Sequence, residues 1–353
     1  MAKKVINEPP TTTTLMTLSQ KFNWGDFVRK YMIVGVLILF VTALAIMTDG
    51  NSIEPVNLVN VIRQVSAIGI IGVGMTFVII TLGIDLSVGS ILGLSAVVAA
   101  SLVQVPGGAL VKFEGIDLPV IVGVLAGLGV GALAGFINGV LIAKFRLAPF
   151  IATLGMMSIA RGLAYLYTGD GRPFSDLKPE YNFIGQGYIF NDPNQPLSGI
   201  PVPVLLFIVV AGIASFILSF TKFGRYNYAI GGNETAARVS GIRIPRVTII
   251  IYTISGLLAG LAGVLLSARI GSGNSTLGTG IELDAITAVI IGGTSFKGGI
   301  GTIWGTIVGA ILIGVINNGL DLMNVSPFLQ IVVKGLIIIV AIIIDERKNS
   351  KKI

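Results

Sequence analysis

Residues 119–143 read PVIVGVLAGLGVGALAGFINGVLIA, and this stretch decides the class of fold. It carries no charged residue, and as an α-helix it is long enough to cross about 30 Å of hydrocarbon. Its glycines recur at an unbroken spacing of four: Gly123, Gly127, Gly131, Gly135 and Gly139. This spacing places them on one helical face, which favours either tight packing against a neighbouring helix or a face that slides during gating.

The composition of the whole chain is that of a membrane protein. Of 353 residues, 53% are hydrophobic and 12% are charged, against about 25% charged in a typical soluble domain. The chain contains no cysteine and no histidine, which excludes disulfides, thiolate nucleophiles, and haem and zinc sites. We therefore expect neither a cofactor nor a metal. The net charge of +7 is a topology signal and does not indicate nucleic acid binding.

Further apolar runs predict an all-α polytopic membrane protein with about ten transmembrane helices. The predicted spans are residues 31–47, 58–82, 86–105, 119–143, 148–167, 202–220, 247–268, 281–293, 300–320 and 328–344. The eighth is too short to cross, which predicts a re-entrant or broken helix. These spans divide the chain into an N-terminal tail (residues 1–30), a transmembrane domain (31–345) and a C-terminal tail (346–353).

Lysine and arginine are concentrated in alternate loops, and such loops are retained in the cytoplasm. We therefore predict that both tails and the loop of residues 221–246 are cytoplasmic. The longest outer loop, residues 168–201, is rich in proline with interspersed aromatic residues. This composition predicts an ordered external loop that meets a partner outside the cell.

The junction between the second and third predicted spans combines glycine with polar side chains. Residues 81–90 read TLGIDLSVGS, and Asp85 and Ser87 are predicted helix caps beside Gly83. One interpretation is a capped, broken helix junction, and the other is a polar segment that lines a gate or transport path. A similar junction, GGTSFKGGIG, recurs at residues 292–301, and both junctions are predicted to face the cytoplasm.

Polar residues inside the predicted spans are a second group of candidates. They are Asn138, Thr153, Ser158, Asn317 and Asn318. Each either hydrogen-bonds to a neighbouring helix or lines a path for a hydroxyl-rich solute.

Charged residues inside spans are costly, so they are expected to face protein or a water-filled cavity. Arg161 and Lys334 are of this kind, and each is predicted either to form a structural ion pair or to belong to a pathway. Glu282 and Asp284 are expected either to pair with Arg269 or to meet an external partner.

The loop of residues 222–246 reads KFGRYNYAIGGNETAARVSGIRIPR. Asn233 as N-cap, Glu234 in the first turn and Gly241 after the last turn predict a short helix. Such a helix is unstable alone in water. It therefore either rests on its own protein or inserts into a cytoplasmic partner.

Five motifs in one order resemble the ribose-type sugar permeases of ABC importers, within the superfamily of monosaccharide and branched-chain amino acid permeases. They are GIDLSVGS at residues 83–90, GGNETAARVSGI at 231–242, GIELDA at 280–285, GGTS at 292–295 and NNGL at 317–320. The resemblance extends from about residue 57 to residue 345, and the N-terminal tail is the main departure.

The resemblance implies a type II ABC importer-like permease in the lipid bilayer of a bacterial cytoplasmic (inner) membrane. Its implied partners are a second permease copy in a homodimer, an ABC ATPase subunit and an extracytoplasmic sugar-binding protein. The resemblance also assigns coupling to the ATPase to a set of loop residues: Gly231, Gly232, Asn233, Glu234, Ala236, Ala237, Arg238 and Gly241.

The chain itself is not predicted to be an enzyme. It has no Gly-x-x-x-x-Gly-Lys-Ser/Thr loop for nucleotide phosphates, so ATP hydrolysis is expected on a separate chain. The gate or pathway candidates are Gly83, Asp85, Ser87, Asn138, Thr153, Asn317 and Asn318.

Two alternatives remain open at this point. The solute is ribose or another small molecule, such as xylose, galactose, a furanose signal or a branched-chain amino acid. An ion-coupled secondary transporter would favour paired acids at the membrane midplane, whereas Asp85, Glu282 and Asp284 lie at predicted span ends.

Overall fold

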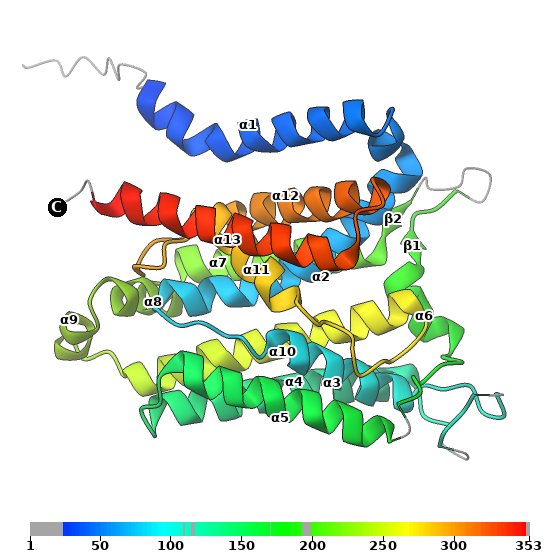
Figure 1. Cartoon of the computed structure of the whole chain (residues 1–353). Helices are drawn as coiled ribbons and strands as arrows, with labels where there is room; N and C mark the ends of the chain where they lie inside the picture. The colour runs from blue at the N-terminus through cyan, green and yellow to red at the C-terminus, as the bar shows by residue number, and fades with distance from the viewer. Residues whose placement is uncertain (1–23, 109, 114–116, 170, 193–198, 351–353) are drawn as a thin grey trace, which may run out of the picture.

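The computed structural model describes residues 24–108, 110–113, 117–169, 171–192 and 199–350. They form one bundle of α-helices (Figure 1). In chain order the helices are α1 (Trp24–Met47), α2 (Pro55–Ile80), α3 (Val88–Ser101), α4 (Val120–Ala143), α5 (Pro149–Thr168), α6 (Pro179–Gln186), α7 (Val202–Phe220), α8 (Lys222–Gly232), α9 (Glu234–Val239), α10 (Ile244–Ile270), α11 (Ile281–Ile291), α12 (Ile303–Leu322) and α13 (Pro327–Ser350). A short 3-10 helix, η1 (Asn51–Ile53), follows α1, and β1 (Tyr188–Ile189) pairs antiparallel with β2 (Ile200–Pro201).

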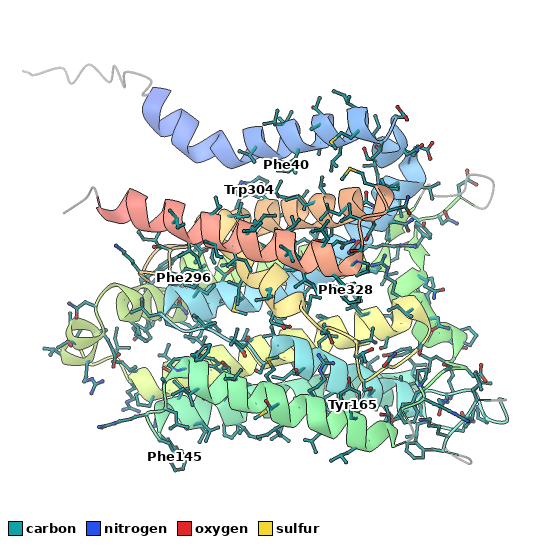
Figure 2. The ribbon with its side chains drawn as sticks, viewed as in Figure 1. Phe40, Phe145, Tyr165, Phe296, Trp304 and Phe328 are labelled. Carbon is teal, nitrogen blue, oxygen red and sulfur yellow. The ribbon has the colours of Figure 1, made fainter. Side chains whose placement is uncertain are left out.

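Six helices are long and apolar enough to cross a membrane, which confirms a polytopic all-α protein. They are α2, α4, α5, α7, α10 and α12. Large apolar side chains lie exposed on the outside of the bundle, among them Phe40, Trp304 and Phe328 (Figure 2). Such a surface is suited to lipid.

The ends of the predicted tails differ from the structure. Helix α1 begins at Trp24, within the predicted N-terminal tail, and α13 continues to Ser350, within the predicted C-terminal tail. Residues 1–23 and 351–353 lie outside the described residues.

The predicted third and eighth spans are short helices. Helix α3 has 14 residues and α11 has 11 residues, so they are about 21 Å and 16 Å long. Neither reaches across about 30 Å of hydrocarbon. Helix α11 is short and mostly buried, in line with the short length of the eighth segment, and the third is shorter than predicted. A re-entrant course of the eighth segment stays a prediction.

The glycine face of α4 packs tightly, as one interpretation predicted. A Cβ atom placed at Gly131 or Gly135 would collide with the backbone of Gly256 in α10. At Gly127 a Cβ would lie 3.1 Å from the Cβ atom of Ala99 in α3. The absent side chains therefore allow the backbones of α3, α4 and α10 to approach closely.

Two irregular segments interrupt the bundle, residues 81–87 before α3 and residues 271–280 before α11. Because these segments run inward, α3 and α11 begin inside the molecule (Figure 1). Their starts meet, since a Cβ atom at Gly278 would lie 2.8 Å from Leu92 Cδ2. Irregular backbone at such a depth requires partners within the protein or water.

The described part of the predicted outer loop, residues 168–201, is ordered by contacts with the bundle. Phe174 and Gly273 exchange two backbone hydrogen bonds of 2.9 Å. Tyr181 of α6 is buried, and its hydroxyl lies 2.6 Å from Ser267 Oγ in α10. These contacts fix the loop to the end of α10.

Candidate functional site

The segment between α2 and α3 is held by a buried hydrogen-bond network centred on Asp85. Its Oδ1 accepts from the backbone N–H of Ser87 at 3.0 Å and from the Ser87 hydroxyl at 2.5 Å. Its Oδ2 accepts from the hydroxyl of Ser255 in α10 at 2.9 Å. Ser87 occupies the N-cap position of α3 as predicted, but its side chain makes no capping hydrogen bond. It donates to Asp85 instead.

Helices α4 and α5 hold the same segment through two further predicted candidates. Asn138 Nδ2 donates to Ser87 Oγ at 2.9 Å, and the Thr153 hydroxyl donates to the carbonyl of Ile84 at 3.2 Å. Asp85, Ser87, Asn138 and Thr153 are all fully buried. In this conformation they tether the segment to three helices and do not line an open path.

Gly83 lies at the start of this segment against Tyr252 of α10. A Cβ atom there would collide with the Tyr252 hydroxyl and would lie 3.0 Å from Val78 Cγ1. A larger residue at this position would therefore require either the Tyr252 side chain or the segment to move.

Replacing Asp85 with alanine is expected to destabilise the protein strongly, because the donors of Ser87 and Ser255 lose their acceptor. Each buried donor left unsatisfied costs about 1–3 kcal/mol. Ser255→Ala removes one donor and is expected to cost about 0.5–1.5 kcal/mol. Thermal unfolding of both variants in detergent micelles measures the difference, and equal losses would contradict the central role of Asp85.

The other two pathway candidates lie elsewhere. Asn318 and Asn57 exchange two side-chain hydrogen bonds of 2.8 Å, which join α12 to α2. Asn317 Nδ2 donates to Asp284 Oδ2 at 3.2 Å, and Lys334 Nζ lies 3.0 Å from the same oxygen. Both asparagines therefore make the contacts between helices that one interpretation predicted.

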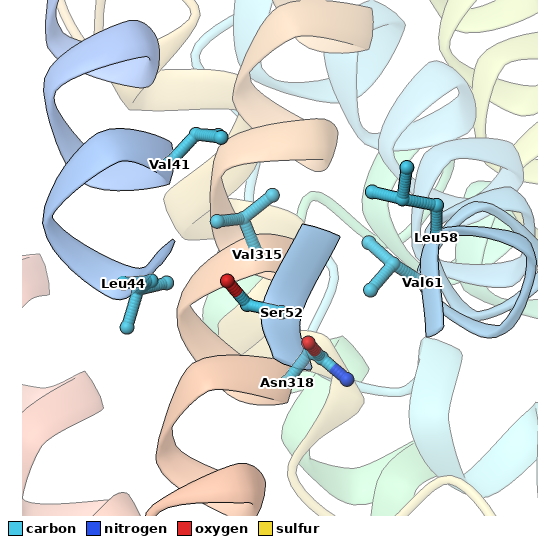
Figure 3. A pocket seen from close by; sticks show the side chains of 7 residues that line it. All are labelled: Val41, Leu44, Ser52, Leu58, Val61, Val315 and Asn318. Atoms are coloured by element: carbon cyan, nitrogen blue, oxygen red, sulfur yellow. The ribbon is translucent and has the colours of Figure 1, made fainter. Parts of the chain in front are cut away.

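A small, mostly apolar pocket lies beside Asn318 between α1, α2 and α12 (Figure 3). Its other lining residues are Val41, Leu44, Ser52, Leu58, Val61 and Val315. This lining offers few partners for a hydroxyl-rich solute.

The charged residues inside the bundle have different partners. Lys334 of α13 forms an ion pair with Asp284, which confirms the predicted ion pair for Lys334. Arg161 of α5 donates to the backbone carbonyls of Ser275 and Leu277 and interacts with Glu282 only electrostatically. Among the described residues no ion pair joins Arg269 to Glu282 or Asp284, and Asp284 is paired with Lys334 instead.

The predicted short cytoplasmic helix is α9. Asn233 Oδ1 accepts from the backbone N–H of Ala236 at 2.9 Å, as an N-cap does, and Glu234 pairs with Arg238 at 2.6 Å. Gly241 follows the helix with a φ of 84°, a left-handed conformation that favours glycine.

The eight proposed coupling residues divide into two groups. Gly231 and Ala237 are buried against the rest of the chain. The others are exposed: Gly232, Asn233, Glu234, Ala236, Arg238 and Gly241. The neighbouring apolar Val239 is 85% exposed. The outer side of α9 is thus free of contacts within the described chain.

Helix α8, which was not predicted, joins α9 to both junctions. Asn227 Nδ2 donates to the carbonyl of Phe77 in α2 at 3.2 Å. The Tyr228 hydroxyl donates to the carbonyl of Gly301 at 2.7 Å, and burial raises the pKa of this phenol. A Cβ atom at Gly231 would collide with the carbonyl oxygen of Ile80 and the amide nitrogen of Gly299.

The two junctions also contact each other, because the amide of Gly299 donates to the carbonyl of Ile80 at 2.9 Å. Helix α8 therefore rests on the end of α2, where the segment with Asp85 begins, and on the turn between α11 and α12. One helix therefore connects α9 to both places.

Comparison with known proteins decides the family. The family described as branched-chain amino acid transport system / permease component matches residues 57–342. The chain belongs to this permease family. The permease is 42% identical to the ribose import permease protein of Bacillus subtilis (strain 168) over 96% of this chain and 99% of that protein. It is 43% identical to the ribose import permease protein of Escherichia coli (strain K12), over 96% and 100% of the two chains.

A more distant relative is the galactose/methyl galactoside import permease protein of Escherichia coli (strain K12). It is 37% identical over 90% of the permease and 94% of that protein. No solved structure matches the permease significantly. The resemblance identified from the motifs is therefore confirmed.

Several residues of the permease site were not predicted from the sequence. Ser255 and Tyr252 lie within a long apolar helix, where nothing in the sequence marks them as neighbours of Asp85. Helix α8 did leave a signal, because Gly224, Asn227 and Gly231 recur at spacings of three and four and all are buried.

Proposed function

We propose that the permease is the membrane-spanning subunit of an ATP-driven importer for ribose in a bacterial inner membrane. The observation that carries this proposal is the identity of 42–43% to ribose import permeases over nearly the whole of both chains. An extracytoplasmic binding protein would deliver the sugar, and a separate ABC ATPase would supply the energy.

In the proposed mechanism the exposed side of α9 docks in a cleft of the ATPase. When ATP binding closes the ATPase pair, α9 moves and carries α8 with it. Because α8 rests on Ile80 and on Gly299, the movement reaches the segment with Asp85 and the turn before α12 together. The cavity between two permease copies would then change the side to which it opens.

We further propose that two copies form the channel and that about ten helices, including the short α3 and α11, make up each copy, with both termini in the cytoplasm. The charge around α8 and α9 supports this orientation. Lys222, Arg225, Arg243 and Arg246 are all exposed there, and basic loops are retained inside.

An ion-coupled transporter is the less favoured alternative, although the sequence argument against it has to be corrected. Asp85, Glu282 and Asp284 lie at helix ends as predicted, but these ends are buried inside the bundle. Asp85 accepts a hydrogen bond from Ser255, Asp284 pairs with Lys334, and Glu282 interacts electrostatically with Arg161. Such pairing, together with the family, favours an ATP-driven permease.

Replacing Gly232 with tryptophan tests the docking. A Cβ atom at Gly232 meets no atom within 4 Å, so the permease itself is expected to fold normally. The indole would occupy the surface that the ATPase requires, and we expect ribose-stimulated ATPase activity of the assembled complex to fall at least tenfold. Gly232→Ala is the matched control and should remain active. Normal activity of the tryptophan variant would contradict the proposed docking.

A panel of sugars tests the solute. Permease, ATPase and binding protein are reconstituted in liposomes, and ATP-dependent accumulation of ribose, xylose and galactose is measured. We expect ribose to accumulate most strongly. Accumulation of galactose without ribose would move the assignment to the solute named for the more distant relatives.

A further inference from the structure

The irregular segment of residues 271–280 lies at membrane depth. Arg161 donates to the carbonyl of Ser275 and, at 3.0 Å, to the carbonyl of Leu277. Arg161 is about 10 Å from Thr168, the outer end of α5, at about 1.5 Å per residue. The segment that it binds is therefore well below the outer surface of the bundle.

One side of this segment is open. Ser275 is buried, but Thr276 and Thr279 are exposed. Both hydroxyls donate hydrogen bonds to nearby residues. The Thr276 hydroxyl donates to Asn274 Oδ1 at 3.1 Å, and the Thr279 hydroxyl donates to the carbonyl of Thr276 at 2.7 Å. The oxygen lone pairs of both threonines remain available to an incoming donor.

The exposed face of α5 beside Arg161 carries two glycines and two hydroxyl-bearing side chains. Gly155, Ser158, Gly162 and Tyr165 follow one another at spacings of three and four and are all exposed; Tyr165 is labelled in Figure 2. A Cβ atom at Gly155 or Gly162 would meet no atom within 4 Å, so no helix of the same chain packs against these glycines. This differs from the packed glycines of α4.

Lipid is a poor partner for such a surface. Irregular backbone and hydroxyls within the hydrocarbon layer are tolerated only where they contact protein or water. Lys334 forms an ion pair with Asp284, and Arg161 binds the carbonyls of this segment and interacts electrostatically with Glu282, so the two positive and two negative charges balance. Hydroxyls and carbonyls without net charge suit a neutral polyhydroxylated solute.

We propose that Thr276 and Thr279, together with Gly155, Ser158 and Gly162 of α5, form one wall of the water-filled path for the sugar, and that a second copy of the chain forms the opposite wall. Toward the cytoplasmic end, α5 continues this face with the exposed apolar residues Ile151 and Leu154. These close the path beneath the polar part. The inference rests on the proposed function and adds the residues that the solute contacts.

Cysteine substitution tests the proposed wall, because the chain contains no cysteine and each introduced thiol is the only one in the permease chain. Ser158→Cys and Thr279→Cys are prepared in the assembled complex in lipid nanodiscs, where both faces are accessible. Ile213→Cys in α7, a residue that is 57% exposed, is the matched control for a side chain that faces lipid. The probe is a positively charged methanethiosulfonate, which reacts with the thiolate and therefore requires water.

We expect Ser158→Cys and Thr279→Cys to react at least tenfold faster than Ile213→Cys. After modification, ATP-dependent ribose uptake in liposomes should be lost for Thr279→Cys and retained for Ile213→Cys. The proposed wall would be contradicted if both path variants reacted as slowly as the control. Full uptake by the modified Thr279→Cys complex would contradict it as well. Uptake by the unsubstituted complex tests the importer separately, since it measures transport without reference to these residues.

Discussion

Replacing Lys334 with methionine will destabilise the permease by about 3–5 kcal/mol, because it leaves a buried carboxylate without its partner. Lys334 Nζ lies 3.0 Å from Asp284 Oδ2, and the side chain of Asp284 is only 9% exposed. Asn317 contacts the same oxygen at 3.2 Å, but an amide does not compensate a full charge. Thermal unfolding in detergent micelles measures the loss.

A matched variant on the same helix separates the charge from the packing. Leu336 is 58% exposed, and Leu336→Met is expected to change the free energy of unfolding by no more than about 0.5 kcal/mol. Adding Asp284→Asn to Lys334→Met removes the uncompensated carboxylate and should restore much of the stability. If Lys334→Met unfolds at the temperature of Leu336→Met, the ion pair has no structural role.

Substituting alanine at Gly231 will uncouple the permease from its ATPase, whereas the same change at Gly232 will not. At Gly231 the added methyl group collides with backbone atoms of Ile80 and Gly299, so α8 must move away from both junctions. Overpacking of this kind costs about 1–3 kcal/mol. We expect ribose-stimulated ATPase activity to fall at least tenfold.

Gly232→Ala, at the adjacent position, is the matched control for Gly231→Ala. The methyl group of Gly232→Ala meets open space, and both glycines lie in the last turn of α8. Both substitutions therefore restrict the helical backbone in the same way, and this effect cancels in the comparison. Equal activity of Gly231→Ala and Gly232→Ala in the complex would show that contact of α8 with the junctions does not transmit the movement.

The helical membrane architecture was largely predictable because the lengths of the apolar segments can be read directly from the sequence. The glycines of α4 predicted their own packing, since spacing of four admits one helical face. The N-cap of α9 was equally local, because Asn233 needs only its own next three residues to cap the helix. Such features depend on neighbours in the chain.

The partners of buried polar residues were not predictable because they come from distant parts of the sequence. Asp85 and Ser255 are far apart in the sequence, as are Asp284 and Lys334, so only the folded bundle brings each pair together. The third predicted span was misjudged for a related reason. Its apolar residues match those of true spans, and only the enclosing protein shows that α3 begins inside the bundle.

The division of residues 222–246 into an inner and an outer side has a consequence for the exchange of the ATPase. Gly231 and Tyr228 contact other parts of the permease, whereas Glu234 and Arg238 pair with each other and Val239 is 85% exposed. Under the proposed docking, recognition of a particular ATPase and transmission of its movement would depend on different side chains. Redesigning the exposed side chains alone is therefore expected to match this subunit to a foreign ATPase while the contacts of α8 stay intact.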